Sequence, residues 1–308
     1  MGGAALVAIG EALYELNREP DGRYLPGFGG DTLNVVIAAA RLGARSAYVT
    51  RLGADLFGDE LRALMQREQV DASGVAMDAE APTGLYFVTH GPQGHVFTYR
   101  RKGSAASLMA PSSLNAGQLR EARCLHASGI SLAISDSAAT TVFEAIAIAR
   151  AAGCQVSFDT NFRARLWTPD KAWPLIARAA AQADILKTSV EDCEGLMRLS
   201  DVREIAACFL GLGARAVIIT LGPEGAVLAT PQGLDHVAGR CVAAVDATGA
   251  GDAFTGALVA ERLRGVPLAE AVRFANAAAA LSTLGRGAIA PLPAREAVDR
   301  QLAAGAVD

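Results

Sequence analysis

Short apolar runs alternate with longer helical stretches along most of this chain, and no other feature limits its fold as strongly. The strand-like runs are Leu6–Ile9, Ala47–Leu52, Cys124–Ser128, Val156–Asp159, Ile185–Lys187 and Ala216–Thr220. The helical stretches include Thr32–Leu42, Leu56–Glu68, Asp136–Ala152 and Ala172–Ala181. Strands separated by helices at this spacing pair in parallel, with helices on both faces. The sequence therefore predicts an α/β fold of three layers, in which helices flank a mostly parallel sheet.

One stretch departs from this alternation. Gly84–His90 and His95–Arg101 are strand-like runs joined by a Gly-Pro turn without a helix, which is typical of a β-hairpin. Together with Ala12–Asn17 they can form a small sheet suited to cover a site as a lid. A plain hairpin at the sheet edge is the alternative. We find no internal repeat or linker, so we expect a single domain, residues 1–308, with a lid from segments of about 12–17 and 84–102.

Composition excludes several classes of protein. Hydrophobic residues make up 51% of the 308 residues and charged residues 19%, which predicts a packed core. The formal net charge is −4 and no basic stripe is present, so nucleic acid is not expected as a partner. A membrane is not expected either, because no apolar run reaches the roughly 18 residues that a span needs. The five scattered cysteines show no metal or redox spacing and are expected to be free thiols of a cytoplasmic protein.

The segment Asp246-Ala-Thr-Gly-Ala-Gly-Asp252 carries the clearest chemical signal. It opens the apolar helical run Ala253–Leu263, and a glycine-rich turn at a helix N-terminus presents backbone N–H groups that bind anions. A carboxylate at its end makes sense if it takes a proton from a hydroxyl that attacks a phosphate. The turn therefore predicts phosphoryl transfer, with Asp252 as the base. A plain helix cap is the structural alternative. A dinucleotide fingerprint would need a third glycine, and the chain contains no P-loop sequence.

A second glycine pair opens the first long helix, in the segment Gly29-Gly30-Asp31-Thr32-Leu33-Asn34. Gly30 permits close approach of a ligand to the backbone. Asp31 and Asn34 offer acceptors and a donor for hydroxyl groups. A simple N-cap role for Asp31 explains the pattern equally well.

The two glycine motifs, their order and their separation resemble the ribokinase-like (PfkB) family of sugar kinases, and the resemblance extends over nearly the whole chain. It implies an ATP-dependent enzyme in which Asp252 is the base. The backbone N–H groups of Gly249, Ala250 and Gly251 would then form the anion hole for the transferred phosphate.

A third segment, Asp159-Thr-Asn-Phe-Arg-Ala-Arg-Leu-Trp167, follows the strand Val156–Phe158. Loops at the carboxyl ends of parallel strands bind ligands in α/β sheets. The segment resembles the D-x-N-x-R-x-x-L-W motif of family members that act on 2-keto-3-deoxygluconate. The resemblance implies that Arg163 contacts the substrate, with Asn161 beside it.

The predicted hairpin resembles the same subgroup, in which tyrosines and an arginine close over the substrate. Matching the motif of the subgroup selects Tyr86, Tyr99 and Arg100. On a regular strand Tyr99 and Arg101 face one way and Arg100 the other, so the choice of Arg100 requires a bend in the backbone. Packing within the small sheet is the alternative role for both tyrosines.

Arginines at two places indicate an anionic substrate. Guanidinium groups match the fork of a carboxylate, and two arginines beside a neutral sugar would leave buried charge uncompensated. The arginines thus predict a small sugar acid, and the resemblance implies phosphorylation of the terminal hydroxyl of 2-keto-3-deoxygluconate, in its gluconate or galactonate form. One arginine could serve the ATP phosphates instead. The alternatives are a neutral-sugar kinase such as a fructokinase, and a non-catalytic protein that binds sugar or nucleotide.

The nucleotide side is expected along Thr220-Leu-Gly222-Pro-Glu-Gly225, which resembles the glycine-bearing turn that borders ATP in the family. Ser189 and Asp192 stand where the family usually has N-x-x-E, a segment that organises Mg²⁺ through water, and this departure leaves the metal ligand unassigned. A helix cap is the alternative role of Ser189. Asn276 matches a position in the adenine pocket. The resemblance implies ATP and Mg²⁺ as cofactors and a homo-oligomer formed through the lid.

Overall fold

The computed structural model describes residues 3–91 and 94–304, and within them a nine-stranded sheet has the order β13-β12-β11-β10-β9-β8-β1-β4-β5. Pairing is parallel from β5 through to β11, and β12 and β13 are antiparallel extensions. The strands are β1 (Leu6–Ile9), β4 (Ser46–Gly53), β5 (Asp71–Asp78), β8 (Cys124–Ser128), β9 (Gln155–Asp159), β10 (Ile185–Ser189), β11 (Val217–Thr220), β12 (Gly225–Thr230) and β13 (Gly233–Ala238). The predicted mostly parallel sheet is confirmed, while β5, β12 and β13 lie outside the predicted strands.

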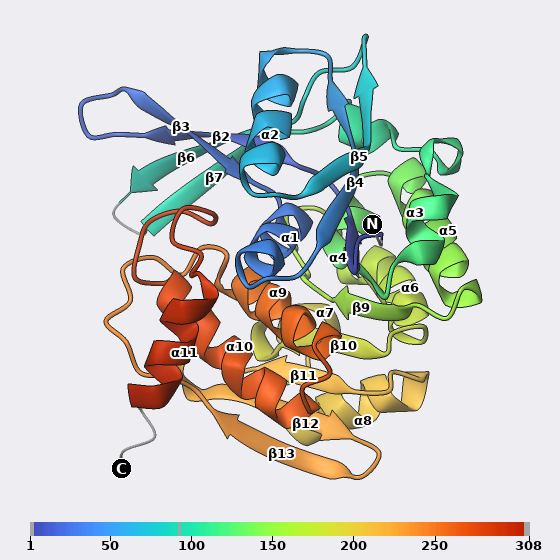
Figure 1. The fold of residues 1–308 in the computed structure, drawn as a ribbon, viewed down its shortest axis with the longest axis vertical. Coiled ribbons are helices and arrows are strands. Elements are labelled where there is room, and N and C mark those ends of the chain that lie inside the picture. The colour runs from blue at the N-terminus through green and yellow to red at the C-terminus, as the bar shows by residue number, and fades with distance from the viewer. Residues whose placement is uncertain (1–2, 92–93, 305–308) are drawn as a thin grey trace.

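Helices cover both faces of this sheet (Figure 1). One group packs in a first core and consists of α1 (Asp31–Arg41), α2 (Leu56–Arg67), α9 (Ala250–Leu263), α10 (Leu268–Ser282) and α11 (Arg295–Ala304). The other packs in a second core and consists of α3 (Ala116–Glu121), α4 (Gly129–Ala133), α5 (Asp136–Ala151), α6 (Pro169–Ala180), α7 (Val190–Met197) and α8 (Val202–Leu212). Short 3₁₀ turns occupy Ala105–Leu108, Pro111–Ser113 and Gly222–Glu224.

The central strand β1 shows why a continuous apolar run is needed here. Leu6 and Ala8 belong to the first core, whereas Val7 and Ile9 belong to the second, because successive side chains of a strand point to opposite faces. All four side chains are fully buried. A strand with helices on both sides cannot alternate polar with apolar residues, so its run of four apolar residues is the expected pattern.

A second sheet, with strand order β3-β2-β6-β7, projects from the body at the upper left of Figure 1. It consists of β2 (Leu13–Arg18), β3 (Tyr24–Gly29), β6 (Leu85–Gly91) and β7 (Gly94–Arg100). The hairpin β6–β7 and the segment around β2 agree with the sequence-based expectation. The edge strand β3 was not expected, because Pro26 and two glycines disfavour a strand except at a sheet edge.

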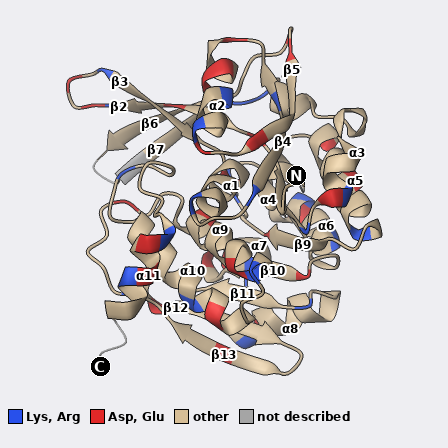
Figure 2. Ribbon diagram, viewed as in Figure 1, with Lys and Arg blue, Asp and Glu red and all other residues tan. Residues whose placement is uncertain are grey.

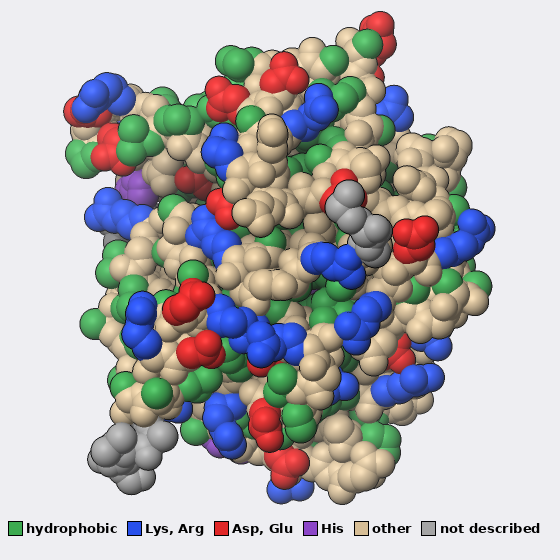
Figure 3. Space-filling model, in the orientation of Figure 1, with side chains coloured by type: hydrophobic (Ala, Val, Ile, Leu, Met, Phe, Trp, Pro, Cys, Tyr) green, Lys and Arg blue, Asp and Glu red, His purple; other side chains and the backbone are tan. Residues whose placement is uncertain are grey.

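Charged side chains of both signs are interspersed over the elements and over the face shown in Figure 3 (Figures 2 and 3). Among residues 3–91 and 94–304, no helix combines the length and hydropathy required to cross a bilayer.

Candidate active site

The turn before α9 is held rigid by Asp246. One carboxylate oxygen, Oδ1, accepts hydrogen bonds from the N–H of Thr248 (2.9 Å) and its hydroxyl (2.7 Å), and Oδ2 accepts from the N–H of Gly287 (2.9 Å). Gly249 has φ of +76°, and a Cβ there would lie 3.0 Å from Cα of Ala288. Only glycine fits this position without strain.

This turn places backbone N–H groups at the start of α9. The N–H of Ala250 donates to the carbonyl of Ala247 (3.1 Å). Within the described part of the chain, the N–H groups of Gly249 and Gly251 have no such backbone acceptor. An anion at this helix N-terminus would therefore meet two available donors together with the positive end of the helix dipole.

Asp252 lies in the first turn of α9, partly buried, and its Oδ2 accepts a hydrogen bond from Nδ2 of Asn34 (2.7 Å). Burial and the nearby charge of Asp31 raise the pKa of Asp252 to about 7, against the lowering effect of the Asn34 hydrogen bond. A carboxylate with a pKa near the working pH is well matched to exchange a proton with a hydroxyl.

The start of α1 brings Gly30, Asp31 and Asn34 to the same place. Gly30 has φ of +121°, and a Cβ there would lie 2.3 Å from the carbonyl oxygen of Glu11, so the position requires glycine. Oδ2 of Asp31 accepts from Nδ2 of Asn161 (3.0 Å) rather than capping the helix. In the described residues, Oδ1 of Asp31 and Oδ1 of Asn34 are buried without a hydrogen-bond partner. Such atoms are expected to meet a ligand or water.

The loop after β9 supplies Asn161 and Arg163. Asn161 adopts φ of +36°, an uncommon value for a residue other than glycine, and its N–H donates to Oδ1 of Asp159 (3.1 Å). Nη1 of Arg163 lies 3.3 Å from Oδ1 of Asp192, and about half of the Arg163 side chain, 53%, is exposed. Trp167 packs against the second core.

The second sheet corrects one expectation. The side chain of Arg100 is exposed, donates to the carbonyl of Tyr99 (3.2 Å) and lies outside the cavity. Arg101 enters the cavity instead, with its guanidinium 4.1 Å from the centre of the Tyr99 ring. No bend occurs between them, so the ordinary alternation of a strand places Tyr99 and Arg101 together. Nη1 of Arg101 lies 2.6 Å from Oε1 of Glu11, a residue that the sequence analysis did not select.

These groups line one cavity of about 760 Å³, here named the Asp31 cavity. The second sheet contributes Tyr86, Phe97 and Tyr99 to its wall. Tyr86 also donates its hydroxyl to Glu15. Of the predicted substrate-binding residues, the cavity contains Gly30, Asp31, Asn34, Tyr86, Tyr99, Asn161 and Arg163.

A neighbouring cavity of about 370 Å³, named the Asn276 cavity, lies on the other side of the glycine turn. Gly249 and Asp252 face the first cavity, Ala250 and Gly251 the second, and Ala247 lines both. The predicted nucleotide-side residues Ser189, Thr220, Gly222, Gly225 and Asn276 all line the Asn276 cavity. Nδ2 of Asn276 is already bound to the carbonyls of Val237 (2.9 Å) and Ala238 (3.1 Å), and Ser189 caps α7.

Lys187 lines the Asn276 cavity beside Gly251, and the sequence analysis did not select it. Its Nζ lies 3.0 Å from Oδ2 of the buried Asp159, and a Cβ on Gly251 would lie 3.0 Å from that same Nζ. Burial lowers the pKa of Lys187, but Asp159 and Asp192 outweigh burial and hold it above its ordinary value. Lys187 is thus a fixed positive charge beneath the glycine turn. In the sequence it stands out as the one charged residue of a buried strand.

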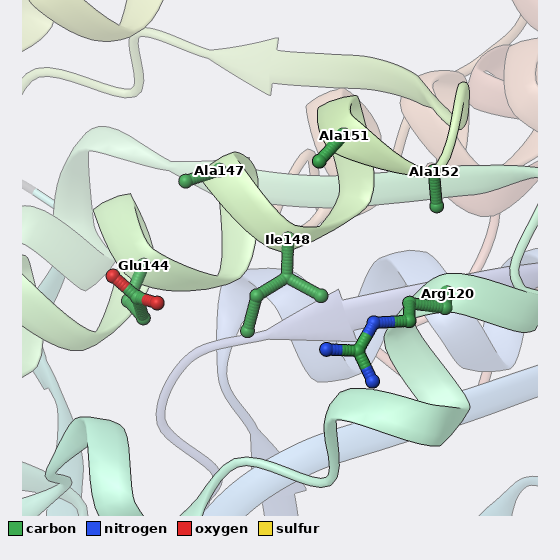
Figure 4. A pocket seen from close by; sticks show the side chains of 6 residues that line it. All are labelled: Arg120, Glu144, Ala147, Ile148, Ala151 and Ala152. Atoms are coloured by element: carbon green, nitrogen blue, oxygen red, sulfur yellow. The ribbon is translucent and has the colours of Figure 1, made fainter.

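A further depression lies between α3 and α5 and is lined by Arg120, Glu144 and four small or aliphatic side chains (Figure 4). It shares no residue with either cavity. In the described residues, no group of three or more His, Cys, Asp or Glu side chains is arranged to hold a metal ion.

Comparisons with known proteins identify the family of this chain. Residues 4–295 match the model of the pfkB family of carbohydrate kinases. A 2-dehydro-3-deoxygluconokinase of Thermoproteus tenax is 37% identical over 95% of this chain and 93% of its own. A probable fructokinase of Arabidopsis thaliana is 36% identical over 94% of this chain and 88% of its own.

Solved structures share the fold. A fructokinase of Xylella fastidiosa with bound ATP superimposes with a TM-score of 0.91 at 26% identity, over 98% of this chain and 99% of that one. An E. coli protein in complex with ATP and Mg²⁺ gives a TM-score of 0.90 at 25% identity, over 99% of this chain and 100% of that one. The ribokinase-like fold class is confirmed. By its sequence, its fold and the glycine turn beside Asp252, this chain belongs to the pfkB family of carbohydrate kinases.

Proposed function

We propose that this protein is an ATP-dependent kinase that phosphorylates the terminal hydroxyl of 2-keto-3-deoxygluconate. The observation that carries the proposal is that Asp252 lines the polar Asp31 cavity and directly follows Ala250 and Gly251, which line the Asn276 cavity. One relative was solved with ATP and another with ATP and Mg²⁺, which supports ATP and Mg²⁺ as the cofactors.

In this proposal the acceptor lies in the Asp31 cavity with its terminal hydroxyl against Asp252. Oδ1 of Asp31 and Oδ1 of Asn34 would accept from the other hydroxyls, since both atoms are otherwise unpartnered among the described residues. Asp252 would take the proton as the hydroxyl oxygen attacks. The N–H groups of Gly249 and Gly251 and the Lys187 ammonium would stabilise the charge on the transferred group, and positioning supplies much of the remaining rate.

The residues fit Mg²⁺ held mainly through phosphate and water. Mg²⁺ in kinases keeps several waters and uses one or two carboxylates rather than a cage of protein ligands. The Asn276 cavity offers Glu191 at its edge, and the described residues contain no three-ligand cluster. When bound, the ion would neutralise charge on the phosphate oxygens.

Two guanidinium groups favour a sugar acid as the acceptor. Arg101 is largely buried, and in the described residues its Nε and Nη1 make no aligned hydrogen bond. Arg163 lines the same cavity and is half exposed. A carboxylate is the group that uses such donors best. The second sheet, which carries Tyr99 and leads into Arg101, would act as the lid.

A fructokinase is the second candidate, and one observation favours it. Both arginines already face a protein carboxylate, Glu11 for Arg101 and Asp192 for Arg163, so a neutral sugar would leave no cation uncompensated. Fructokinases also stand close to the sugar-acid kinase in identity to this chain.

A substrate panel tests the choice. ADP formation would be measured with 2-keto-3-deoxygluconate, fructose and ribose at equal concentrations. We expect kcat/KM for the sugar acid to exceed that for fructose by roughly 100-fold or more, the value of about 3 kcal/mol of charge-assisted binding. A preference for fructose would replace the first candidate with the second. If no ADP forms with any of the three sugars, both candidates are contradicted.

A further inference from the structure

Glu11 is the most unusual side chain in the Asp31 cavity. It lies two residues after the end of β1, is only 1% exposed and lines the cavity. Within residues 3–91 and 94–304, neither of its carboxylate oxygens makes an aligned hydrogen bond, although Oε1 lies 2.6 Å from Nη1 of Arg101. A buried carboxylate in this state is expensive unless a partner or a proton compensates its charge.

The groups that face Glu11 come from three other elements. The charge of Arg101, which follows β7, favours the ionised form of Glu11, whereas the charge of Asp31 in α1 disfavours it. Tyr99 of β7 and Tyr48 of β4 also lie close enough to feel its charge, and the hydroxyl of Tyr48 is paired with that of Thr32 (2.9 Å). Burial, the largest effect, raises the pKa of Glu11 to about 7. Glu11 therefore sits where a modest change in nearby charge changes its protonation.

We propose that Glu11 takes up a proton from solvent when a sugar acid binds, and thereby releases Arg101 to the carboxylate of the substrate. This inference rests on the proposed sugar-acid substrate and makes Glu11 a specificity-determining residue. An anion beside Arg101 brings a second negative charge next to Glu11 in a site removed from water. Two carboxylates that share one site do not both stay ionised. A neutral sugar adds no charge, so Glu11 keeps its pairing with Arg101 and takes up no proton.

The sign of the pH dependence follows from this exchange. Below pH 7 Glu11 already carries the proton, and binding of the anion is at its strongest. Above pH 7 the proton must be taken from solvent, so the Kd of the sugar acid rises about tenfold per pH unit until the pKa of Glu11 in the complex is reached. The Kd of fructose shows no such dependence on Glu11.

Calorimetric titration of the full-length protein without nucleotide tests the proposal. Binding of 2-keto-3-deoxygluconate would be measured at pH 8 in two buffers with different heats of ionisation, which gives the number of protons taken up. We expect uptake that approaches about one proton per site for the wild type and near zero for Glu11→Gln. Fructose is the neutral control. Because Asp252 also titrates near pH 7, the Asp252→Asn variant is the second control and must retain the uptake.

Equal uptake in wild type and Glu11→Gln, or binding of the acid by the wild type without uptake, would overturn the inference and leave the proposed function intact. Binding of fructose with no binding of the acid would instead overturn the proposed function, and this inference with it. If Glu11→Gln does not fold, the difference in uptake between the acid and fructose on the wild-type protein still decides the matter.

Discussion

The two cavities that meet at the glycine turn differ in how they present polar groups. In the Asp31 cavity, buried atoms of Glu11, Asp31, Asn34 and Arg101 lack aligned hydrogen-bond partners among the described residues. Among the described residues, no side chain that lines the Asn276 cavity has a buried polar atom without a hydrogen-bond partner, and the lining is rich in glycine and alanine. Each unsatisfied buried polar atom costs about 1–3 kcal/mol, so the polar atoms of the first cavity favour a ligand or water that supplies the missing hydrogen bonds.

The difference teaches how the two ligands are recognised. The acceptor would be chosen by a few side chains whose hydrogen bonds are incomplete without it. The nucleotide would be chosen by shape and by backbone N–H groups, which a substitution of one side chain changes little.

Replacement of Asp252 by Asn acts where the cavities meet. It removes the proton acceptor but keeps a group of the same shape for Asn34, so kcat should fall by roughly 10²–10⁴, the usual contribution of a general base. Nucleotide Kd, measured by titration calorimetry, should stay within a factor of about two of wild type. The exposed Asp235→Asn is the matched control. Near-full activity of the Asp252 variant would refute its role.

Replacement of Gly249 by Ala tests the backbone side. The new Cβ would lie 3.0 Å from Cα of Ala288, and alanine would have to adopt the left-handed φ of this position. The turn must therefore shift, and kcat should fall roughly 10–10²-fold, as expected for misplaced oxyanion donors. Gly265 has φ of +86° with nothing within 4 Å of its Cβ position, so Gly265→Ala carries the strain without the clash. Equal losses in both variants would show that backbone strain alone is responsible.

Replacement of Arg101 by Met tests the side-chain recognition. Loss of a charge-assisted contact should raise KM for the sugar acid roughly 10–10²-fold and leave KM for ATP unchanged. Arg100→Met, one residue away on the opposite face, should stay within about twofold in steady-state kinetics. If Arg100→Met has the larger effect, the observed orientation of β7 is not the one that binds the acceptor.

A last expectation concerns the stability of the folded protein. The pKa of Asp252 is raised in the folded protein, so the folded state holds its proton up to about pH 7 and stability falls as pH rises from about 4 to 7. Asp252→Asn should therefore be more stable than wild type at pH 8, by on the order of 1–4 kcal/mol, and equal to it near pH 4. Denaturant unfolding at both pH values measures this. A variant less stable at pH 8 would contradict the raised pKa.

The features that sequence predicted well are those with local causes. The strand and helix alternation follows from burial on two faces, and the turn at Asp246 follows from the backbone angles that only glycine adopts. The prediction that Arg100 faces the cavity was wrong, because a shift of one residue along a strand moves a side chain to the opposite face. Glu11 and Lys187 escaped notice because a single charged residue beside or within an apolar strand has no partner in the sequence, and both partners, Arg101 and Asp159, are distant along the chain.

The strand order has a consequence for how the site comes into being. Strands β8 to β13 are sheet neighbours in chain order, and β4 and β5 also pair in sequence, so each part can form from contacts that are short along the chain. The pairing of β1 with β8 joins Leu6 to Cys124 and closes a long loop, which is the slow kind of contact in folding. Asp31 and Asn34 lie within that loop of the chain, whereas Asn161 and Asp252 come after it. A refolding chain should therefore regain most of its helical signal before its first turnover.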